Sequence, residues 1–223
     1  MARKIKAILF DLDGTLVDTI EDIAAAFSAT IAKEGLDPAT VAETKQVVGR
    51  GLVNALKDLL TLRKHTVSEE RFNELLEFLF TYYGQHPVVY SKPFEGMKEL
   101  VQSLQGRYRL GVISNKDHEL TQFVIDTLLG DISWDVVRGL DEQYPRKPDV
   151  GSFTPFVKTM KLGLDEMLLI GDSEVDYQSA VAAEMDSILV SWGFRPKEAL
   201  TALDGSRVVD SVQELKEALD AIQ

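Results

Sequence analysis

The chain has 223 residues, of which 45% are hydrophobic, so it is long enough to bury one large core or a core and a smaller module. Its formal net charge of -12 produces a field that repels phosphate backbones, which argues against nucleic acid and anionic membranes as partners. A small anionic substrate would therefore need a metal ion, a few Lys or Arg side chains or backbone amides close to its binding site.

The absence of cysteine excludes disulfides, thiolate nucleophiles and Cys-ligated zinc. The first apolar run, residues 5–10, is too short for the core of a signal peptide, and no long apolar run follows it. We therefore expect a cytoplasmic protein without a membrane partner. We also expect a monomer, because the apolar faces described below can all be buried within one chain.

The first predicted strand, residues 5–10, runs directly into Asp11-Leu12-Asp13-Gly14-Thr15. Two carboxylates so close together at the end of a buried strand repel each other and lose hydration, so they require a cation, a proton or a chemical task. Gly14 lacks a Cβ and permits a tight turn, while Thr15 is expected to hydrogen-bond back to the loop and fix the carboxylates. The segment marks a candidate site.

A long insert follows the first strand, and its apolar residues recur at helical spacing. Three amphipathic helices are predicted within residues 20–31, 52–60 and 72–83, and Gly35 is placed as the stop of the first. Residues 18–90 are therefore interpreted as a separate helical module, joined to the rest of the chain by linkers near Val17 and Ser91. Such a module is expected to act as a mobile lid over a site.

Further apolar runs rich in Ile, Leu and Val predict strands at residues 109–113, 167–170, 187–190 and 207–209. With helical segments between most of them, the pattern predicts a parallel sheet covered on both faces. Polar clusters end the first strand and the next two, at Asp11-Leu12-Asp13, Ser114-Asn115-Lys116 and Gly171-Asp172-Ser173. Because ligands bind beyond the carboxyl ends of such strands, these clusters are expected to converge.

Four motifs in chain order resemble those of the haloacid dehalogenase superfamily of phosphotransferases. Asp-x-Asp-Gly-Thr stands as Asp11 to Thr15, and a Ser or Thr that closes a strand stands as Ser114. A lysine commonly followed by proline corresponds to Lys147-Pro148, and Gly-Asp-x-x-x-Asp corresponds to residues 171–176. The resemblance covers essentially the whole chain. It implies an α/β fold, in which a Rossmann-like parallel sheet core (1–17 and 91–223) carries an inserted all-helical cap domain (18–90).

The resemblance also implies roles for the motif residues. Asp11 would be the nucleophile that forms an aspartyl-phosphate, and Asp13 the acid that protonates the leaving oxygen and then the base that activates water. Ser114 and Lys147 would hold phosphoryl oxygens, with backbone amides near Gly14 and Asn115 as further donors. The implied phosphate-binding set is Gly14, Thr15, Ser114, Asn115 and Lys147.

Mg²⁺ is the implied cofactor, since it prefers a site made of oxygen ligands. The implied ligands are Asp11, the carbonyl oxygen of Asp13, Asp172 and Asp176, the last bound directly or through water. The ion would neutralise the repulsion between the nucleophile and the phosphate.

Two segments outside the motifs bear on specificity and stability. Gly49-Arg50-Gly51 is similar to a Gly-rich cap loop that faces the substrate in related phosphatases, where Arg50 would hold a carboxylate or second phosphate; an exposed arginine in a helix connection is equally compatible. Family members often carry Gly after Ala in the turn where this chain has Ala183-Glu184-Met185. If that turn needs a positive φ, Glu184 costs on the order of 1 kcal/mol. Lys116 and Arg146 receive no role.

The presence of Asp13 favours phosphate esters as substrates, because dehalogenases and phosphonate-cleaving relatives usually lack an acid at this position. Residues 19–23 and 48–51 are similar to the corresponding parts of phosphoglycolate phosphatases. The expected function is Mg²⁺-dependent hydrolysis of a small phosphorylated metabolite such as phosphoglycolate. The alternatives are a β-phosphoglucomutase-like phosphosugar mutase, a pyrophosphatase and a catalytically silent metabolite-binding protein.

Overall fold

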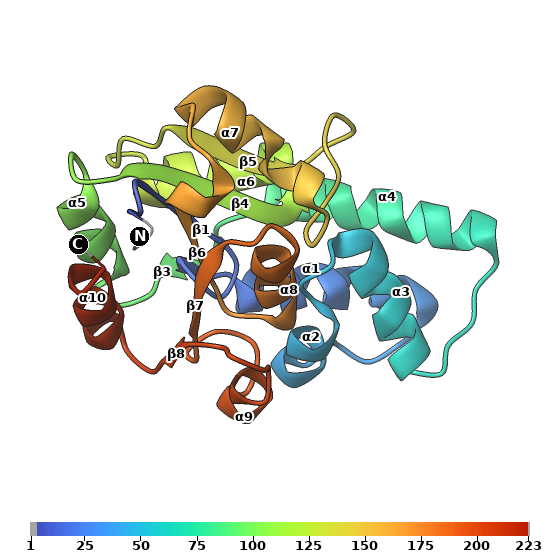
Figure 1. Cartoon of the computed structure of the whole chain (residues 1–223). Coiled ribbons are helices and arrows are strands. Elements are labelled where there is room, and N and C mark those ends of the chain that lie inside the picture. The colour runs from blue at the N-terminus through green and yellow to red at the C-terminus, as the bar shows by residue number, and fades with distance from the viewer. Residues whose placement is uncertain (1–3, 223) are drawn as a thin grey trace.

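The structure is a computed structural model, and it describes residues 4–222. Its centre is a six-stranded sheet in which every neighbouring pair is parallel, in the order β5-β4-β1-β6-β7-β8. The strands are β1 (Ala7–Phe10), β4 (Arg109–Asp117), β5 (Val136–Leu140), β6 (Met167–Gly171), β7 (Asp186–Val190) and β8 (Val208–Val209). The predicted α/β, Rossmann-like parallel sheet is confirmed (Figure 1).

Helices cover both faces of the sheet, and β1 shows how alternate side chains reach them. Ile8 and Phe10 pack in one apolar cluster with α5 (Met97–Leu104), α6 (His118–Leu129) and α10 (Val212–Asp220). Ala7 and Leu9 pack in another with α7 (Thr154–Met160) and α8 (Glu174–Ala182). All four side chains of β1 are fully buried, which explains why this strand reads as an unbroken apolar run.

The edge strand β5 was not predicted. Its five residues are only half-buried, and Arg138 and Gly139 interrupt the apolar pattern, so the sequence carries no clear strand signal there. Three short helices complete the part of the chain that follows β4: η2 (Val150–Phe153), η3 (Leu164–Glu166) and α9 (Lys197–Thr201). In residues 4–222, we find no helix with the length and apolar character that a membrane span requires.

Between β1 and β4 lies the helical segment, by which we mean residues 18–90. It contains α1 (Ile20–Ile31), η1 (Ala32–Glu34), α2 (Val41–Val47), α3 (Leu52–Leu62) and α4 (Glu69–Gln85). The three predicted helices are present. The first, α1, ends at Ile31 and continues directly into η1, and Gly35, with a φ of 69°, ends η1. The short helix α2 was not predicted; Thr40 and Glu43 form a capping box at its start.

The two ends of the helical segment meet. The strand β2 (Val17–Asp18) pairs antiparallel with β3 (Lys92–Pro93), close to the predicted linkers. The Asp22 carboxylate, which is buried, accepts hydrogen bonds from the backbone N–H groups of Val89, Tyr90 and Ser91. The helices have an apolar cluster of their own, to which Leu120 and Phe194 also contribute. The division of the chain into a core and a cap domain stays a prediction.

Candidate active site

The polar residues at the carboxyl ends of β1, β4 and β6 meet at one cavity, which is partly open to solvent. Parallel strands place their carboxyl ends at the same edge of a sheet, so residues distant in sequence meet there. Six of the predicted residues line this cavity: Asp11, Asp13, Ser114, Asn115, Lys147 and Asp172. The structure therefore brings most of the predicted site together.

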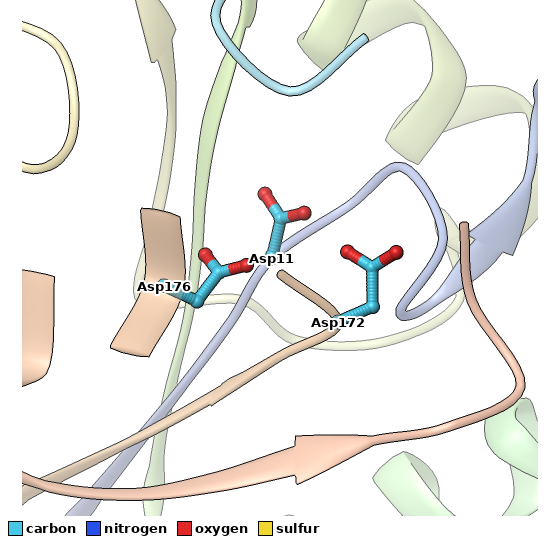
Figure 2. A group of neighbouring side chains, drawn as sticks. All are labelled: Asp11, Asp172 and Asp176. Atoms are coloured by element: carbon cyan, nitrogen blue, oxygen red, sulfur yellow. The ribbon is translucent and has the colours of Figure 1, made fainter. Parts of the chain in front are cut away.

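Three buried carboxylates form the centre of the site. Asp11 follows β1, Asp172 follows β6, and Asp176 lies in the first turn of α8. One carboxylate oxygen from each lies within 4.8 Å of the others. Figure 2 shows the three side chains pointing toward a common space.

Lys147 is the buried cation of this cluster. Its Nζ donates to Asp11 Oδ1 and to Asp176 Oδ1, at 2.7 Å each, and to the carbonyl oxygen of Ile113 at 3.0 Å. Burial disfavours the ammonium form, but the two carboxylates outweigh it and raise the pKa of Lys147. The lysine therefore stays charged and ties the nucleophile candidate to the fourth motif.

The carboxylates of the cluster are held in an unfavourable environment. Burial raises the pKa of Asp11 to about 7; Lys147 opposes this shift, and the negative charge of Asp176 adds to it. Burial, followed by the charges of Asp11 and Asp176, raises the pKa of Asp172 well above its usual value. The one buried ammonium does not balance the charge of the three buried carboxylates, and every atom that these carboxylates offer to a metal ion is oxygen. This donor set fits a divalent cation such as Mg²⁺.

Close backbone approaches shape this cluster. Gly14 has a φ of +88°, and a Cβ there would lie 2.4 Å from Asp172 Oδ2. Gly193 was not predicted as part of the site, yet a Cβ there would lie 2.3 Å from the same oxygen. The next residue, Phe194, donates its backbone N–H to Asp172 Oδ2 at 2.7 Å. The segment after β7 thus fixes a carboxylate of the candidate metal site.

Asp13 is held by a hydrogen-bond network of its own. Its Oδ1 accepts from Thr19 Oγ1 at 2.6 Å and from Lys116 Nζ at 2.8 Å. The prediction that the Thr15 hydroxyl fixes the carboxylates is wrong: Thr15 Oγ1 is buried and has no hydrogen-bond partner among residues 4–222. Thr15 is also absent from the lining of the cavity. The tight turn at Gly14 directs Thr15 into the interior, and Thr19 provides the bond instead.

Asn115 connects three parts of the site. Its Oδ1 accepts from the backbone N–H of Lys147 at 2.9 Å, and its Nδ2 donates to the carbonyl oxygens of Lys147 and Gly49 at 3.0 Å each. The neighbouring Ser114 hydroxyl accepts from the backbone N–H of Lys116 at 3.1 Å. Asn115 therefore positions the loop that carries Lys147 and contacts the helical segment.

The cavity loop, residues 48–51, closes one side of the cavity. Gly49 and Gly51 line the cavity, whereas Arg50 does not. The Arg50 side chain is 60% exposed and forms an ion pair of 2.5 Å with Asp58. Arg195, which was not predicted, lines the cavity and donates to the carbonyl oxygens of Lys45 and Val48. An isolated arginine after a predicted strand carries no sequence signal that would have identified it.

The parallel sheet and the acidic cluster with its buried lysine define the class of this protein. Residues 8–190 match the family described as haloacid dehalogenase-like hydrolase, and the chain belongs to this family. Phosphoglycolate phosphatase from Aquifex aeolicus is 31% identical over 194 residues, which cover 85% of this chain and 86% of that protein. The chain is likewise similar to phosphoglycolate phosphatase from Rhodospirillum rubrum, with 29% identity over 94% of this chain and 89% of that protein.

A solved structure is similar over nearly the whole length. It is the crystal structure of a protein from Lactobacillus delbrueckii subsp. bulgaricus that has been provisionally named a phosphoglycolate phosphatase. The TM-score is 0.87 at 30% identity, and the match covers 97% of this chain and 98% of that one. The similarity therefore includes the helical segment as well as the sheet.

Proposed function

We propose that this protein is a Mg²⁺-dependent phosphatase that hydrolyses a small phosphorylated metabolite of the phosphoglycolate type. The observation that carries the proposal is the buried trio Asp11, Asp172 and Asp176 beside Lys147, next to a cavity that Asp11, Asp172 and Asp13 line. The names of the similar proteins from Aquifex aeolicus and Rhodospirillum rubrum add support for the substrate class.

In the proposed reaction, Asp11 attacks phosphorus and forms an aspartyl-phosphate, while Asp13 protonates the leaving oxygen. Asp13 then takes a proton from the water that hydrolyses the intermediate. The Lys147 ammonium, 2.7 Å from Asp11, stabilises the negative charge of the transferring phosphoryl group. Ser114, Asn115 and the backbone near Gly14 and Thr15 are proposed as its remaining donors.

Asp11, Asp172, Asp176 and the carbonyl oxygen of Asp13 would hold the metal ion. When bound, Mg²⁺ supplies positive charge that offsets the repulsion between a carboxylate nucleophile and an anionic phosphate. The need for such a charge is large here, because the chain carries a formal net charge of -12. The same net charge supports the proposal that the protein binds neither nucleic acid nor anionic membranes. We further propose a cytoplasmic monomer, and size-exclusion chromatography would test the oligomeric state.

The lining of the cavity favours a small leaving group over a sugar. The helical segment contributes apolar side chains and glycines to this lining and, among the described residues, no hydroxyl or amide side chain: Ile23, Val48, Gly49, Gly51, Leu52 and Ala55. The several hydroxyls of a sugar would lose water there without gaining partners, which is costly. This observation favours a phosphatase over a phosphosugar mutase, and over a pyrophosphatase with its highly charged leaving group.

A carboxylate on the leaving group is compatible with the same lining. The helix α3 begins at the cavity through Gly51 and Leu52. The first N–H groups of a helix have no acceptor within the helix, and its dipole favours negative charge. Phosphoglycolate combines a phosphate with one small carboxylate, so it suits this end of the cavity better than a neutral polyol.

The experiment that tests the proposal is phosphate release from a panel of small phosphoesters, sugar phosphates and pyrophosphate, with Mg²⁺ and with excess chelator. We expect Mg²⁺-dependent release with a preference for small carboxylated esters. Asp11→Asn should reduce kcat by about 1,000-fold or more, because an amide is not a nucleophile toward phosphorus. Asp126→Asn, at an exposed position of α6, is the matched control and should keep full activity. Release of phosphate by Asp11→Asn at the wild-type rate would contradict the assignment.

A further inference from the structure

Lys116 is a buried lysine that the reaction described above leaves without a role. It lies near the end of β4, two residues after Ser114, and only 2% of its side chain is exposed. Burying an ammonium group is unfavourable unless it is paired and hydrogen-bonded, so a lysine at this depth requires specific partners. Apolar packing alone therefore does not explain why a lysine is buried at this position.

The hydrogen-bond partners of Lys116 come from the loop after β1 and from the helical segment. Its Nζ donates to Asp13 Oδ1 at 2.8 Å and to the Tyr83 hydroxyl at 2.7 Å. Tyr83 lies in α4 of the helical segment and is fully buried. Lys116 thus links Asp13, the proposed acid and base, to the helix α4 of the helical segment.

Only one of the two carboxylate oxygens of Asp13 accepts hydrogen bonds from the described residues. Both hydrogen bonds that the described residues make to the Asp13 carboxyl group, from Lys116 and from Thr19, go to Oδ1. Two donors on one oxygen fix the rotation of the carboxyl group. The other oxygen, Oδ2, stays available to the cavity that Asp13 lines.

We propose that Lys116, held by Tyr83, is a positioning residue for Asp13: it engages Oδ1 and leaves Oδ2 as the oxygen that exchanges a proton with the leaving group. This proposal rests on the proposed phosphatase function. In the first step, a carboxylate oxygen of Asp11 bonds to phosphorus, the bond from phosphorus to the ester oxygen breaks, and the proton on Asp13 Oδ2 moves to that leaving oxygen. In the second step, the water oxygen bonds to phosphorus, the bond from phosphorus to the Asp11 oxygen breaks, and Oδ2 takes back a proton from that water, so that inorganic phosphate leaves and Asp11 is again a carboxylate.

A lysine that merely supports the fold and a lysine that positions the acid differ in one measurable respect. An alkoxide leaving group requires protonation as the bond to phosphorus breaks, whereas a p-nitrophenolate leaving group is stable without it. Since kcat/KM covers only the steps up to formation of the aspartyl-phosphate, it reports on the acid and not on the later hydrolysis. Loss of positioning should therefore depend on the leaving group.

The test compares kcat/KM for an alkyl ester, the best substrate of the panel, with kcat/KM for p-nitrophenyl phosphate in three variants. For Lys116→Met we expect a loss of about 100-fold on the alkyl ester and less than about 10-fold on the aryl ester, in line with typical general-acid contributions. Tyr83→Phe removes only the hydroxyl, so its loss should have the same selectivity and be smaller. Lys98→Met removes a surface lysine that pairs with Asp131, and should leave both values unchanged.

Equal losses on the two esters would overturn the role of Lys116, because a structural defect affects both alike. If Lys116→Met does not fold, as judged by circular dichroism, Tyr83→Phe decides the question: a selective loss supports the proposal and equal values for wild type and Tyr83→Phe on the alkyl ester overturn it. A wild-type protein that hydrolyses neither ester would overturn the proposed function, and the role of Lys116 with it. The two failures are distinguished by the wild-type rates.

Discussion

The Arg195 guanidinium donates a hydrogen bond of 2.7 Å to the carbonyl oxygen of Val48, and the two residues, far apart in the sequence, both line the cavity. It also donates to the carbonyl oxygen of Lys45 at 2.6 Å and to Glu174 Oε2 at 2.8 Å. Glu174 belongs to the fourth motif, and Phe194, beside Arg195, holds Asp172 through its backbone. One two-residue stretch therefore contacts both the candidate metal site and the cavity loop.

The first prediction concerns this contact. Arg195→Met should release the cavity loop and raise KM for the best ester by about 10-fold or more, since hydrogen bonds from a charged group contribute roughly 1.5–3 kcal/mol each. Arg195→Lys should recover only part of this effect, because lysine lacks the planar fork of arginine. The measurement is a KM and kcat determination for both variants.

Arg63 offers a matched control for Arg195. It donates to Glu43 and to the carbonyl oxygen of Pro38, all within the helical segment and away from the cavity lining. Its hydrogen bond to Glu43 is the largest cause that lowers the pKa of that carboxyl to about 2. Arg63→Met should lower Tm and leave KM unchanged. An unchanged KM in Arg195→Met would show that the contact does not hold the loop in solution.

The second prediction concerns pH and metal. Asp11 has a pKa raised from 3.8 to about 7, so between these values the folded chain without metal binds more protons than the unfolded chain. Stability without metal should therefore fall as pH rises through this window. Mg²⁺ competes with these protons, so the increase in Tm on adding Mg²⁺ should be larger at about pH 8 than at about pH 5.5. Thermal unfolding with MgCl₂ and with chelator measures both effects; an increment that is the same at both pH values would contradict the prediction.

The third prediction concerns Gly193. Gly193→Ala should weaken Mg²⁺ binding by roughly 10–100-fold, as is typical when a residue that positions a metal ligand is changed. The reason is steric: the added Cβ would lie 2.3 Å from Asp172 Oδ2 and 2.5 Å from the carbonyl oxygen of Gly14, so the carboxylate must move. Isothermal titration with MgCl₂ would measure the change.

Gly84 provides the control for this substitution. It lies in the last turn of α4, and a Cβ there would meet no atom within 4 Å outside the neighbouring backbone of that helix. Gly84→Ala should stabilise the protein by up to roughly 0.5–1 kcal/mol, since glycine loses more conformational freedom than alanine in a helix, and should leave Mg²⁺ affinity unchanged. Mg²⁺ affinity of Gly193→Ala equal to that of Gly84→Ala would refute the steric argument.

The fourth prediction concerns Glu184. Its φ is 53°, so the turn after α8 does adopt the left-handed conformation that disfavours a side chain with a Cβ. Glu184→Gly should raise the free energy of unfolding by up to about 1 kcal/mol without changing activity. Glu184→Ala keeps the unfavourable φ and should not stabilise the protein, which separates the backbone effect from any effect of the carboxylate. Chemical denaturation of the wild type and the two variants measures this effect. Equal midpoints for Glu184→Gly and the wild type would contradict the prediction that the backbone at Glu184 is strained.

Elements with a strong apolar pattern were predictable, and those without one were not. The strand β1 is buried on both faces and stands out as an unbroken apolar run, while the helix α3 has one buried face whose apolar residues recur at helical spacing. The half-buried β5 and the seven-residue α2 bury too few side chains to leave such a pattern. The pairing of β2 with β3 involves two residues on each strand, 75 positions or so apart, which no local pattern encodes.

The sequence by itself determined the nature of the chemical groups: a strand followed by Asp11 and Asp13, a lysine at 147 and a Gly-Asp motif at 171. These residues can be recognised because each lies in a short motif, in which the residue types and their spacing are visible in the sequence. Only the tertiary structure decided which other groups join them. Lys116, Tyr83, Gly193 and Arg195 act through contacts between segments far apart in the chain, and a single polar residue or glycine carries no sign of what it will contact. Folding the parallel sheet brings the strand ends to one edge, and that geometry selects the contacts.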